Sequence, residues 1–91
     1  MTTIQPHFRH DKFDYEQIHR KGNVAVFRQS KGGKTYGFET VIIGHRRAGT
    51  LPDGTHFPEG EAYPRSEEWG TRGWSYRDES DAMAKAITLA A

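Results

Sequence analysis

Histidines are the side chains whose type and spacing could bind a metal ion or transfer a proton. His7 and His10 are three residues apart, a spacing found among zinc ligands, but a basic residue lies between them and the chain has no cysteine to complete a site. His56 is close in sequence to Glu59 and Glu61, which could form an acid–base pair with it, yet no nucleophile accompanies them. The sequence therefore predicts no metal site, no cofactor and no catalytic residue.

Residues 31–35 read KGGKT and end in the Gly-Lys-Thr triplet found in phosphate-binding loops. The glycine that begins such a loop is absent upstream, and the residues that follow favour a strand, whereas a phosphate-binding loop leads into a helix. Two consecutive glycines between strand-forming residues are typical of a tight hairpin turn. We interpret this segment as a turn and expect that the protein is not an enzyme.

Positive charge is concentrated in the first half of the chain. Residues 1–50 carry a net charge of +5 and residues 51–91 a net charge of −4, which together give the +1 of the whole chain. A sheet followed by a helix can place its exposed face in the major groove of DNA, with basic side chains on the phosphates. Against this, the isoelectric point of about 8.1 is below the value of about 9 that marks nucleic-acid-binding domains. The candidate nucleic-acid-binding residues are Arg20, Lys21, Arg28, Lys31, Lys34, Arg46 and Arg47.

A second candidate surface is aromatic and lies in the second half of the chain. Residues 63–76 contain two Trp and two Tyr in the company of arginines, and these three residue types dominate binding hot spots. The same rings could instead only hold a loop against a sheet, and this interpretation is the stronger one for Trp74. We name Tyr63, Trp69 and Arg72 as the candidate partner-binding residues.

The composition indicates one small folded domain, over residues 13–91. Among the 91 residues, five Phe, four Tyr and two Trp supply the buried apolar area that the few aliphatic residues do not. The absence of cysteine excludes disulfides, and no apolar segment approaches the roughly 20 residues that cross a membrane. The first residues also lack the apolar segment of a secretory signal. We expect a cytoplasmic protein without membrane contact.

The pattern of apolar residues predicts an α+β fold. Alternation of apolar and polar residues predicts strands at residues 13–20, 24–29, 36–46 and 73–77. The acidic start and alanine-rich body of residues 79–90 predict a helix. The architecture is then an antiparallel sheet of three or four strands with one C-terminal helix packed on one face. Met83 and Ile87, four residues apart, are expected to pack on the face of the sheet that carries the aromatic core.

Two segments have less regular patterns. Residues 1–12 show little periodicity and are interpreted as a flexible N-terminal arm. Residues 48–72 contain three prolines and four glycines and exceed the usual loop length of compact domains. Phe57, Tyr63 and Trp69 recur in this segment every six residues and could hold it on the sheet, so we expect a long ordered loop.

Five short segments carry a resemblance to other proteins, namely residues 22–29 (GNVAVFRQ), 39–43 (ETVII), 61–64 (EAYP), 69–70 (WG) and 73–76 (GWSY). Together with the closing acidic, alanine-rich helix, they resemble a loosely defined group of short phage and prophage proteins of unassigned function. The group has no established catalytic residues to transfer. The resemblance implies a phage-encoded protein that binds a host macromolecule stoichiometrically, for example to inhibit CRISPR or another defence system.

Two hypotheses about function follow from these observations. The first is a non-catalytic binding protein whose partner is a host protein complex in the host cytoplasm, contacted through the aromatic residues of the second half. The alternative is a sheet-based DNA-binding accessory protein that contacts phosphates through the basic residues of the first half. An uncharacterised enzyme has the least support, since no motif names a reaction.

Overall fold

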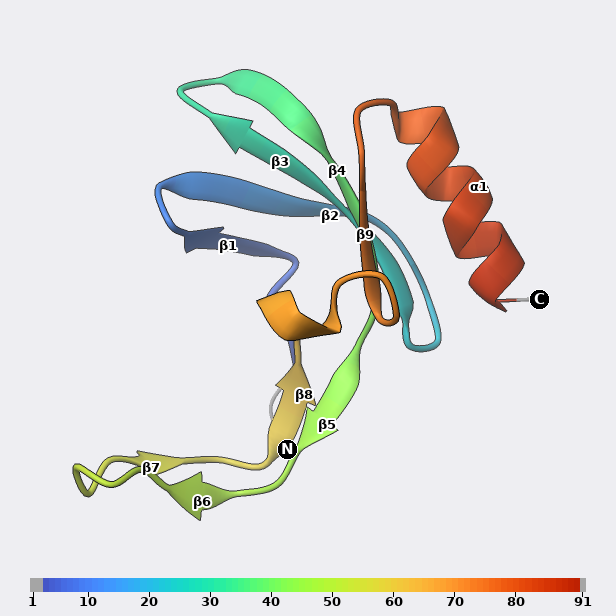
Figure 1. Cartoon of the computed structure of the whole chain (residues 1–91). Coiled ribbons are helices and arrows are strands. Elements are labelled where there is room, and N and C mark those ends of the chain that lie inside the picture. Colours follow the sequence, from blue (N-terminus) through green and yellow to red (C-terminus); the bar gives the residue numbers. More distant parts are fainter. Residues whose placement is uncertain (1–2, 91) are drawn as a thin grey trace.

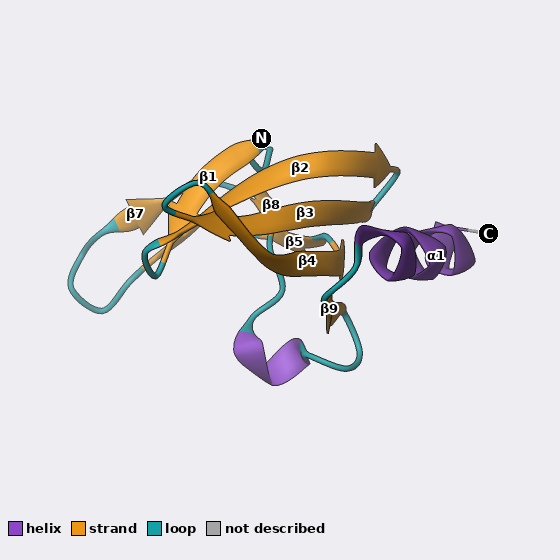
Figure 2. Cartoon of the chain, turned by 90° about the horizontal axis from the view of Figure 1, so that it is seen from above, coloured by secondary structure: helices purple, strands orange, loops and turns teal. Residues whose placement is uncertain are grey.

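An antiparallel sheet with a helix packed against it forms the body of the molecule (Figures 1 and 2). The computed structural model describes residues 3–90. The sheet has the strand order β1-β2-β3-β4-β9. Its strands and the helix are β1 (His7–His10), β2 (Phe13–Lys21), β3 (Val24–Lys31), β4 (Lys34–Ile42), β9 (Gly73–Tyr76) and α1 (Glu79–Ala90). The predicted α+β class and C-terminal helix are confirmed, and the sheet has five strands where three or four were expected.

The additional strand, β1, lies in the segment interpreted as a flexible arm, and that interpretation is corrected for residues 7–10. β1 pairs with β2 along its whole length, and Phe8 stacks on Tyr15 with the ring centroids 4.9 Å apart. Asp11 and Lys12 form the two-residue turn, with φ angles of 51° and 70°. Hairpin turns of this kind usually contain Asn or Gly, so the sequence carried little signal for it. Residues 1–2 of the expected arm lie outside the described residues.

Helix α1 packs on one face of the sheet through its smallest side chains. Ala82 and Ala86 are fully buried against Val24 and Val26 of β3. The hydroxyl of Thr40, also fully buried, donates a hydrogen bond of 2.8 Å to the carbonyl oxygen of Ala82. This bond joins a strand directly to the backbone of the helix, and the alanines leave room for so close an approach.

The prediction that Met83 and Ile87 form the buried stripe of the helix is wrong for Ile87, whose exposed fraction is 65%. Met83 is partly buried at the side of the contact. The buried stripe consists of Ala82 and Ala86, which have the same spacing of four residues, because the short distance between helix and sheet leaves no room for a branched side chain. The helix also lies on the face opposite to the rings around Phe27, while Phe38 and Tyr76 pack on its own face, so the expected contact with the aromatic core is corrected too.

The other face of the sheet carries an aromatic cluster, defined here as Phe8, Tyr15, Phe27, Tyr63 and Trp69. Phe27 and Tyr15 are buried side chains of neighbouring strands, and the remaining three rings are partly buried against them. Successive residues of a strand point to opposite faces, so Val26 faces the helix while Phe27 faces this cluster. The sheet is therefore covered on both faces, by a helix on one and by aromatic side chains on the other.

Residues 44–62 leave the sheet as a long β-arm (Figure 1). Two short strand pairs form it, β5 (Gly44–Arg46) with β8 (Gly60–Ala62) and, farther out, β6 (Gly49–Thr50) with β7 (His56–Phe57). The strand predicted at residues 36–46 is thus divided: β4 ends at Ile42, and β5 belongs to the arm. After the arm, the 3-10 helix η1 (Ser66–Glu68) leads back towards the sheet.

The spacing of Phe57, Tyr63 and Trp69 predicted that all three rings hold residues 48–72 on the sheet. This prediction is wrong for Phe57. Its ring lies against Gly49 inside the arm, where an added Cβ would come within 2.7 Å of it. The guanidinium of Arg46 lies 5.0 Å from the centroid of the same ring.

In residues 3–90 there is no helix with the length and apolar character needed to cross a membrane.

The helix contact generates a prediction about stability. Replacing Ala86 with Leu should destabilise the protein by about 1–3 kcal/mol, because the added carbons have no space between α1 and β3. Ile87→Ala should change the free energy of unfolding by less than about 0.5 kcal/mol, as is usual for surface positions. Urea denaturation measures both values, and Ala84→Leu at an exposed position of the same helix is the matched control. A large loss for Ile87→Ala would contradict the packing described here.

Candidate functional site

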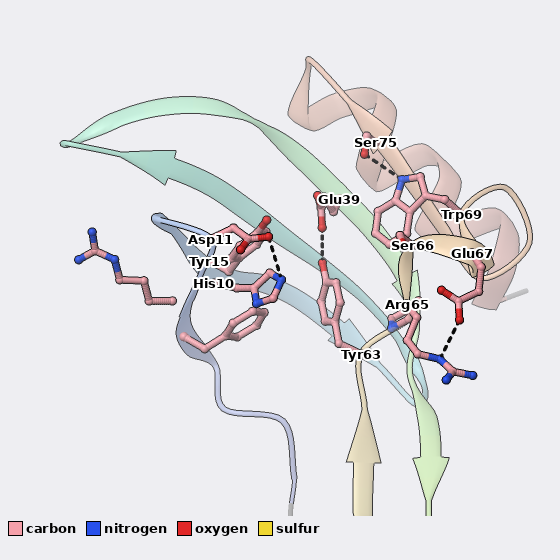
Figure 3. A pocket seen from close by; sticks show the side chains of 13 residues that line it. His10, Asp11, Tyr15, Glu39, Tyr63, Arg65, Ser66, Glu67, Trp69 and Ser75 are labelled. Atoms are coloured by element: carbon pink, nitrogen blue, oxygen red, sulfur yellow. Dashed lines mark hydrogen bonds and ion pairs between the residues drawn. The ribbon is translucent and has the colours of Figure 1, made fainter. Parts of the chain in front are cut away.

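An open cavity of about 840 Å³ lies beside the aromatic cluster and is the candidate site (Figure 3). We call it the aromatic groove. Its walls come from the end of β1, from the sheet and from the segment that connects the arm to β9. The side chains that line it include Phe8, His10, Asp11, Tyr15, Glu39, Tyr63, Arg65, Glu67, Trp69 and Ser75.

Tyr63 is held at the centre of the groove by rings from three parts of the chain. Its centroid lies 5.3 Å from that of Phe27 and 5.5 Å from that of Phe8, both edge-on. Trp69 lies on the other side, with the centroids 6.4 Å apart and an interplanar angle of 30°. Edge-on and offset rings are the favoured aromatic geometries. Tyr63 is therefore fixed in position while it still lines the cavity.

Trp69 lies against β9 because Gly73 has no side chain. A Cβ at Gly73 would come within 2.6 Å of the indole ring. The indole Nε1–H donates a hydrogen bond of 3.0 Å to Ser75 Oγ, two residues farther along β9. Part of the ring stays in contact with the groove, so Trp69 is both a packed side chain and a wall of the cavity.

Glu39 is the charged group inside the groove, and the sequence analysis did not single it out. It is half-buried on β4, opposite Phe27 of β3 on one side and Ser75 of β9 on the other. The hydroxyl of Tyr63 donates a hydrogen bond of 2.6 Å to Glu39 Oε1. Burial raises the pKa of Glu39 above its usual value, although the bond from Tyr63 acts in the opposite direction. Burial and the nearby Glu39 charge in turn raise the pKa of Tyr63.

Two side-chain contacts lie at the rim of the groove, one between an imidazole and a carboxylate and one between an arginine and a glutamate. His10 Nε2 lies 3.3 Å from Asp11 Oδ2 at one end, and Arg65 Nε lies 3.4 Å from Glu67 Oε1 at the other (Figure 3). Figure 3 also shows the Arg65 guanidinium turned towards Glu67 and away from Tyr63. No ion pair among the described residues includes Glu39.

The structure brings two of the three candidate partner-binding residues together. Tyr63 and Trp69 both line the aromatic groove, whereas Arg72 lines a second hollow of about 630 Å³ between the arm and η1. Arg72 Nε lies 3.7 Å from Glu68 Oε2 there. Tyr63 lines both cavities, so it separates the two surfaces.

The candidate nucleic-acid-binding residues are not brought together on one surface. Arg20 and Lys21 lie at one end of β2, and Lys31 and Lys34 lie at the β3–β4 turn, about 20 Å away at roughly 3.3 Å per residue. Arg46 and Arg47 lie on the arm. Several of these cations also have partners within the chain. Arg20 and Arg28 form ion pairs with Glu61 and Glu16, and Lys31 and Arg46 lie over the rings of Phe13 and Phe57.

Arg20 and Glu61 form the best-connected ion pair of the described residues. Arg20 Nη1 and Nη2 donate hydrogen bonds of 2.8 and 2.6 Å to the two carboxylate oxygens, and the backbone N–H of Ile4 donates a third of 3.1 Å. These bonds lower the pKa of Glu61 from 4.5 to about 2. The pair ties the arm to β2 and to the N-terminal segment, so Arg20 is committed to an internal contact.

The histidines that suggested chemistry are separated in the structure. His7 and His10 point to opposite faces of β1, because side chains alternate along a strand and these two residues are an odd number of positions apart. His7 lies beside Asp14 and His10 beside Asp11. His56 Nδ1 lies 3.0 Å from Thr50 Oγ1, and the carboxylate of Glu59 lies 3.0 Å from His45 Nε2. Within residues 3–90 there is no group of three His, Asp or Glu side chains that could hold a metal ion.

Glu39 and Phe8 are the site residues that sequence reasoning missed. A signal for Glu39 was present, because this carboxylate lies in a strand between Phe38 and the buried Val41. Such a residue must have a polar partner or reach solvent. Phe8 gave no comparable signal, since its segment had no strand pattern.

Comparisons of the chain with protein-family models, with curated proteins and with solved structures found no match.

The Arg20–Glu61 pair generates a prediction about pH. Because folding lowers the pKa of Glu61, its contribution to stability is fully present above about pH 4.5 and is lost as the pH falls towards about 2. Glu61→Gln should therefore destabilise the protein at pH 7 by about 1.5 kcal/mol, the low end for hydrogen bonds to charged groups. The difference from wild type should shrink as the pH is lowered from 5 to about 2.

Thermal melting across this pH range measures the effect. Glu67→Gln is the control, because the exposed pair of Glu67 with Arg65 should contribute little at any pH. Equal stability of Glu61→Gln and wild type at pH 7 would show that the pair does not hold the arm.

Proposed function

We propose that this chain is a non-catalytic binding protein that holds a protein partner in the aromatic groove. The observation that carries the proposal is the position of Tyr63 and Trp69, which line an open cavity while their packing keeps them in place. Rigid aromatic side chains in a pocket are the usual centre of a binding hot spot, since they bury a large area at little cost in conformational entropy.

The size of the groove favours a segment of polypeptide as the occupant. Its volume of about 840 Å³ exceeds that of any single side chain, and it opens to solvent, so a chain can cross it. Half-buried rings beside polar groups such as Glu39 and Ser75 give the mixed character of a protein interface.

The separation of the candidate acid–base residues supports a binding role over catalysis. In the described residues, His56 contacts Thr50, while Glu59 and Glu61 contact His45 and Arg20. The acid–base pairing suggested by their spacing is therefore not assembled. The resemblance to short phage proteins supports a host protein complex as the partner, including a defence complex that the protein inhibits stoichiometrically in the host cytoplasm.

DNA binding is the alternative and has weaker support. The basic residues of the first half are divided among the end of β2, the body of β3, the β3–β4 turn and the arm, and four of them contact groups of the same chain. A duplex-binding surface instead aligns several free cations along the phosphates.

Affinity capture from a bacterial lysate, with and without nuclease, tests the proposal. A protein partner should be retained after nuclease treatment. Trp69→Ala should weaken its capture at least tenfold, the loss typical of a hot-spot residue, whereas Lys31→Ala at the far end of the sheet should have little effect. Thermal melting establishes first that each variant is folded. Equal capture by Trp69→Ala and wild type would contradict the proposal.

Binding to random duplex DNA separates the two hypotheses. We expect weak binding at physiological salt. Tight binding that falls with salt at a slope of about −0.9 per phosphate contacted would favour the DNA-binding alternative.

A further inference from the structure

We infer that the aromatic groove accepts an arginine side chain of the partner, with Glu39 as its counter-ion and the rings of Tyr63 and Trp69 as its walls. The inference rests on the proposed function and names the chemistry that the groove recognises. Three features of the groove support it: the charge of Glu39, the second oxygen of its carboxylate and the neighbouring rings.

Glu39 forms no ion pair with a cation of residues 3–90, although the imidazole of His10 is close enough to lower its pKa. Among residues 3–90, the lining charges Asp11 and Glu67 are paired with His10 and Arg65, whereas no ion pair reaches Glu39. Arg9, the other cation that lines the groove, is an exposed residue of β1. A half-buried carboxylate interacts strongly with an incoming cation because the surroundings screen the charge less than water does.

One oxygen of Glu39 is available for the partner. Tyr63 donates its hydrogen bond to Oε1, and no donor of the described residues reaches Oε2. The Tyr63 hydroxyl thus holds one carboxylate oxygen and leaves the other as an acceptor for a partner.

The rings beside Glu39 suit a guanidinium. Tyr63 and Trp69 lie at 6.4 Å and 30° to each other, and both line the groove next to the carboxylate. Cations are attracted to the faces of such rings, and tryptophan is the strongest partner. A guanidinium is planar and weakly hydrated, so it can stack on a ring while its N–H groups donate to a carboxylate. An ammonium is more strongly hydrated and cannot stack, which makes arginine the expected residue and lysine a weaker one.

Titration of the full chain with short capped peptides tests this inference. The peptides are glycine-flanked and differ only in a central arginine, lysine or citrulline, the last being nearly the same shape without charge. The readout is the NMR signal of the Trp69 indole N–H, with that of Trp74 as an internal control because Trp74 does not line the groove. The arginine peptide should shift the Trp69 signal saturably at up to millimolar concentration, and citrulline should bind at least tenfold more weakly. Equal binding of arginine and citrulline peptides would overturn the inference.

Glu39→Gln provides the matched variant. Glutamine keeps the size of the side chain and an oxygen that can accept from Tyr63, but it removes the charge. Binding of the arginine peptide should fall at least tenfold. Glu16→Gln, which removes the same charge on β2 beside Arg28, should leave binding unchanged. The comparison of arginine with citrulline on wild type remains decisive if Glu39→Gln does not fold.

The two proposals fail in different ways. If Glu39→Gln captures the host protein as well as wild type while Trp69→Ala does not, the groove binds a partner without using an arginine, and only this inference is wrong. If Trp69→Ala captures the partner normally, the proposed function itself is wrong. No shift of the Trp69 signal with the arginine peptide at millimolar concentration would also overturn the inference.

Discussion

The burial of Phe27 is the interaction on which the remaining structure depends. Its side chain is fully buried near the middle of β3, the central strand of the sheet, and the rings of Phe8 and Tyr63 pack edge-on against it at 5.5 and 5.3 Å. These contacts join the N-terminal segment, the sheet and the segment after the arm around one ring. Burial of such large apolar surfaces supplies most of the stabilisation that a chain with few aliphatic residues can obtain. The aromatic groove forms beside this packing, because two separate segments cover the sheet without closing over Glu39.

Two glutamates show how the same side chain takes opposite roles in one small protein. Glu61 accepts three hydrogen bonds, two of them from Arg20, and its charged form is stabilised. Glu39 has one hydrogen bond from Tyr63 and is placed among rings, so burial disfavours its charge. A protein tolerates a carboxylate of the second kind only where other packing offsets the cost. We take this placement as a property of a recognition site, since a cation from a partner would complete it.

The two faces of the sheet differ in how closely they are packed. On one face, Ala82 and Ala86 bring α1 close to β3, and the Thr40 hydroxyl bonds to the helix backbone, so that contact is filled by small groups. On the other face, large rings meet at angles and leave a cavity of about 840 Å³ beside them. Small side chains can fill an interface closely, whereas rings that meet edge-on leave open space next to their faces. The surface that we propose for a partner therefore lies on the aromatic face.

The sequence by itself determined the elements whose patterns are local. Period-two alternation and glycine turns placed β2, β3, β9 and the beginning of β4, and the acidic, alanine-rich end placed α1 within a residue or two. Tertiary structure decided what depends on segments distant in the chain. β1 forms because Phe8 finds Tyr15 and Phe27, and β5 leaves the sheet because it pairs with β8. Tyr63 and Trp69 were predicted as site residues from their type, but their meeting with Glu39 was not, since 24 residues separate Glu39 from Tyr63. Local patterns report the periodicity of one element, whereas a binding site depends on which faces meet, and only the packed chain fixes that.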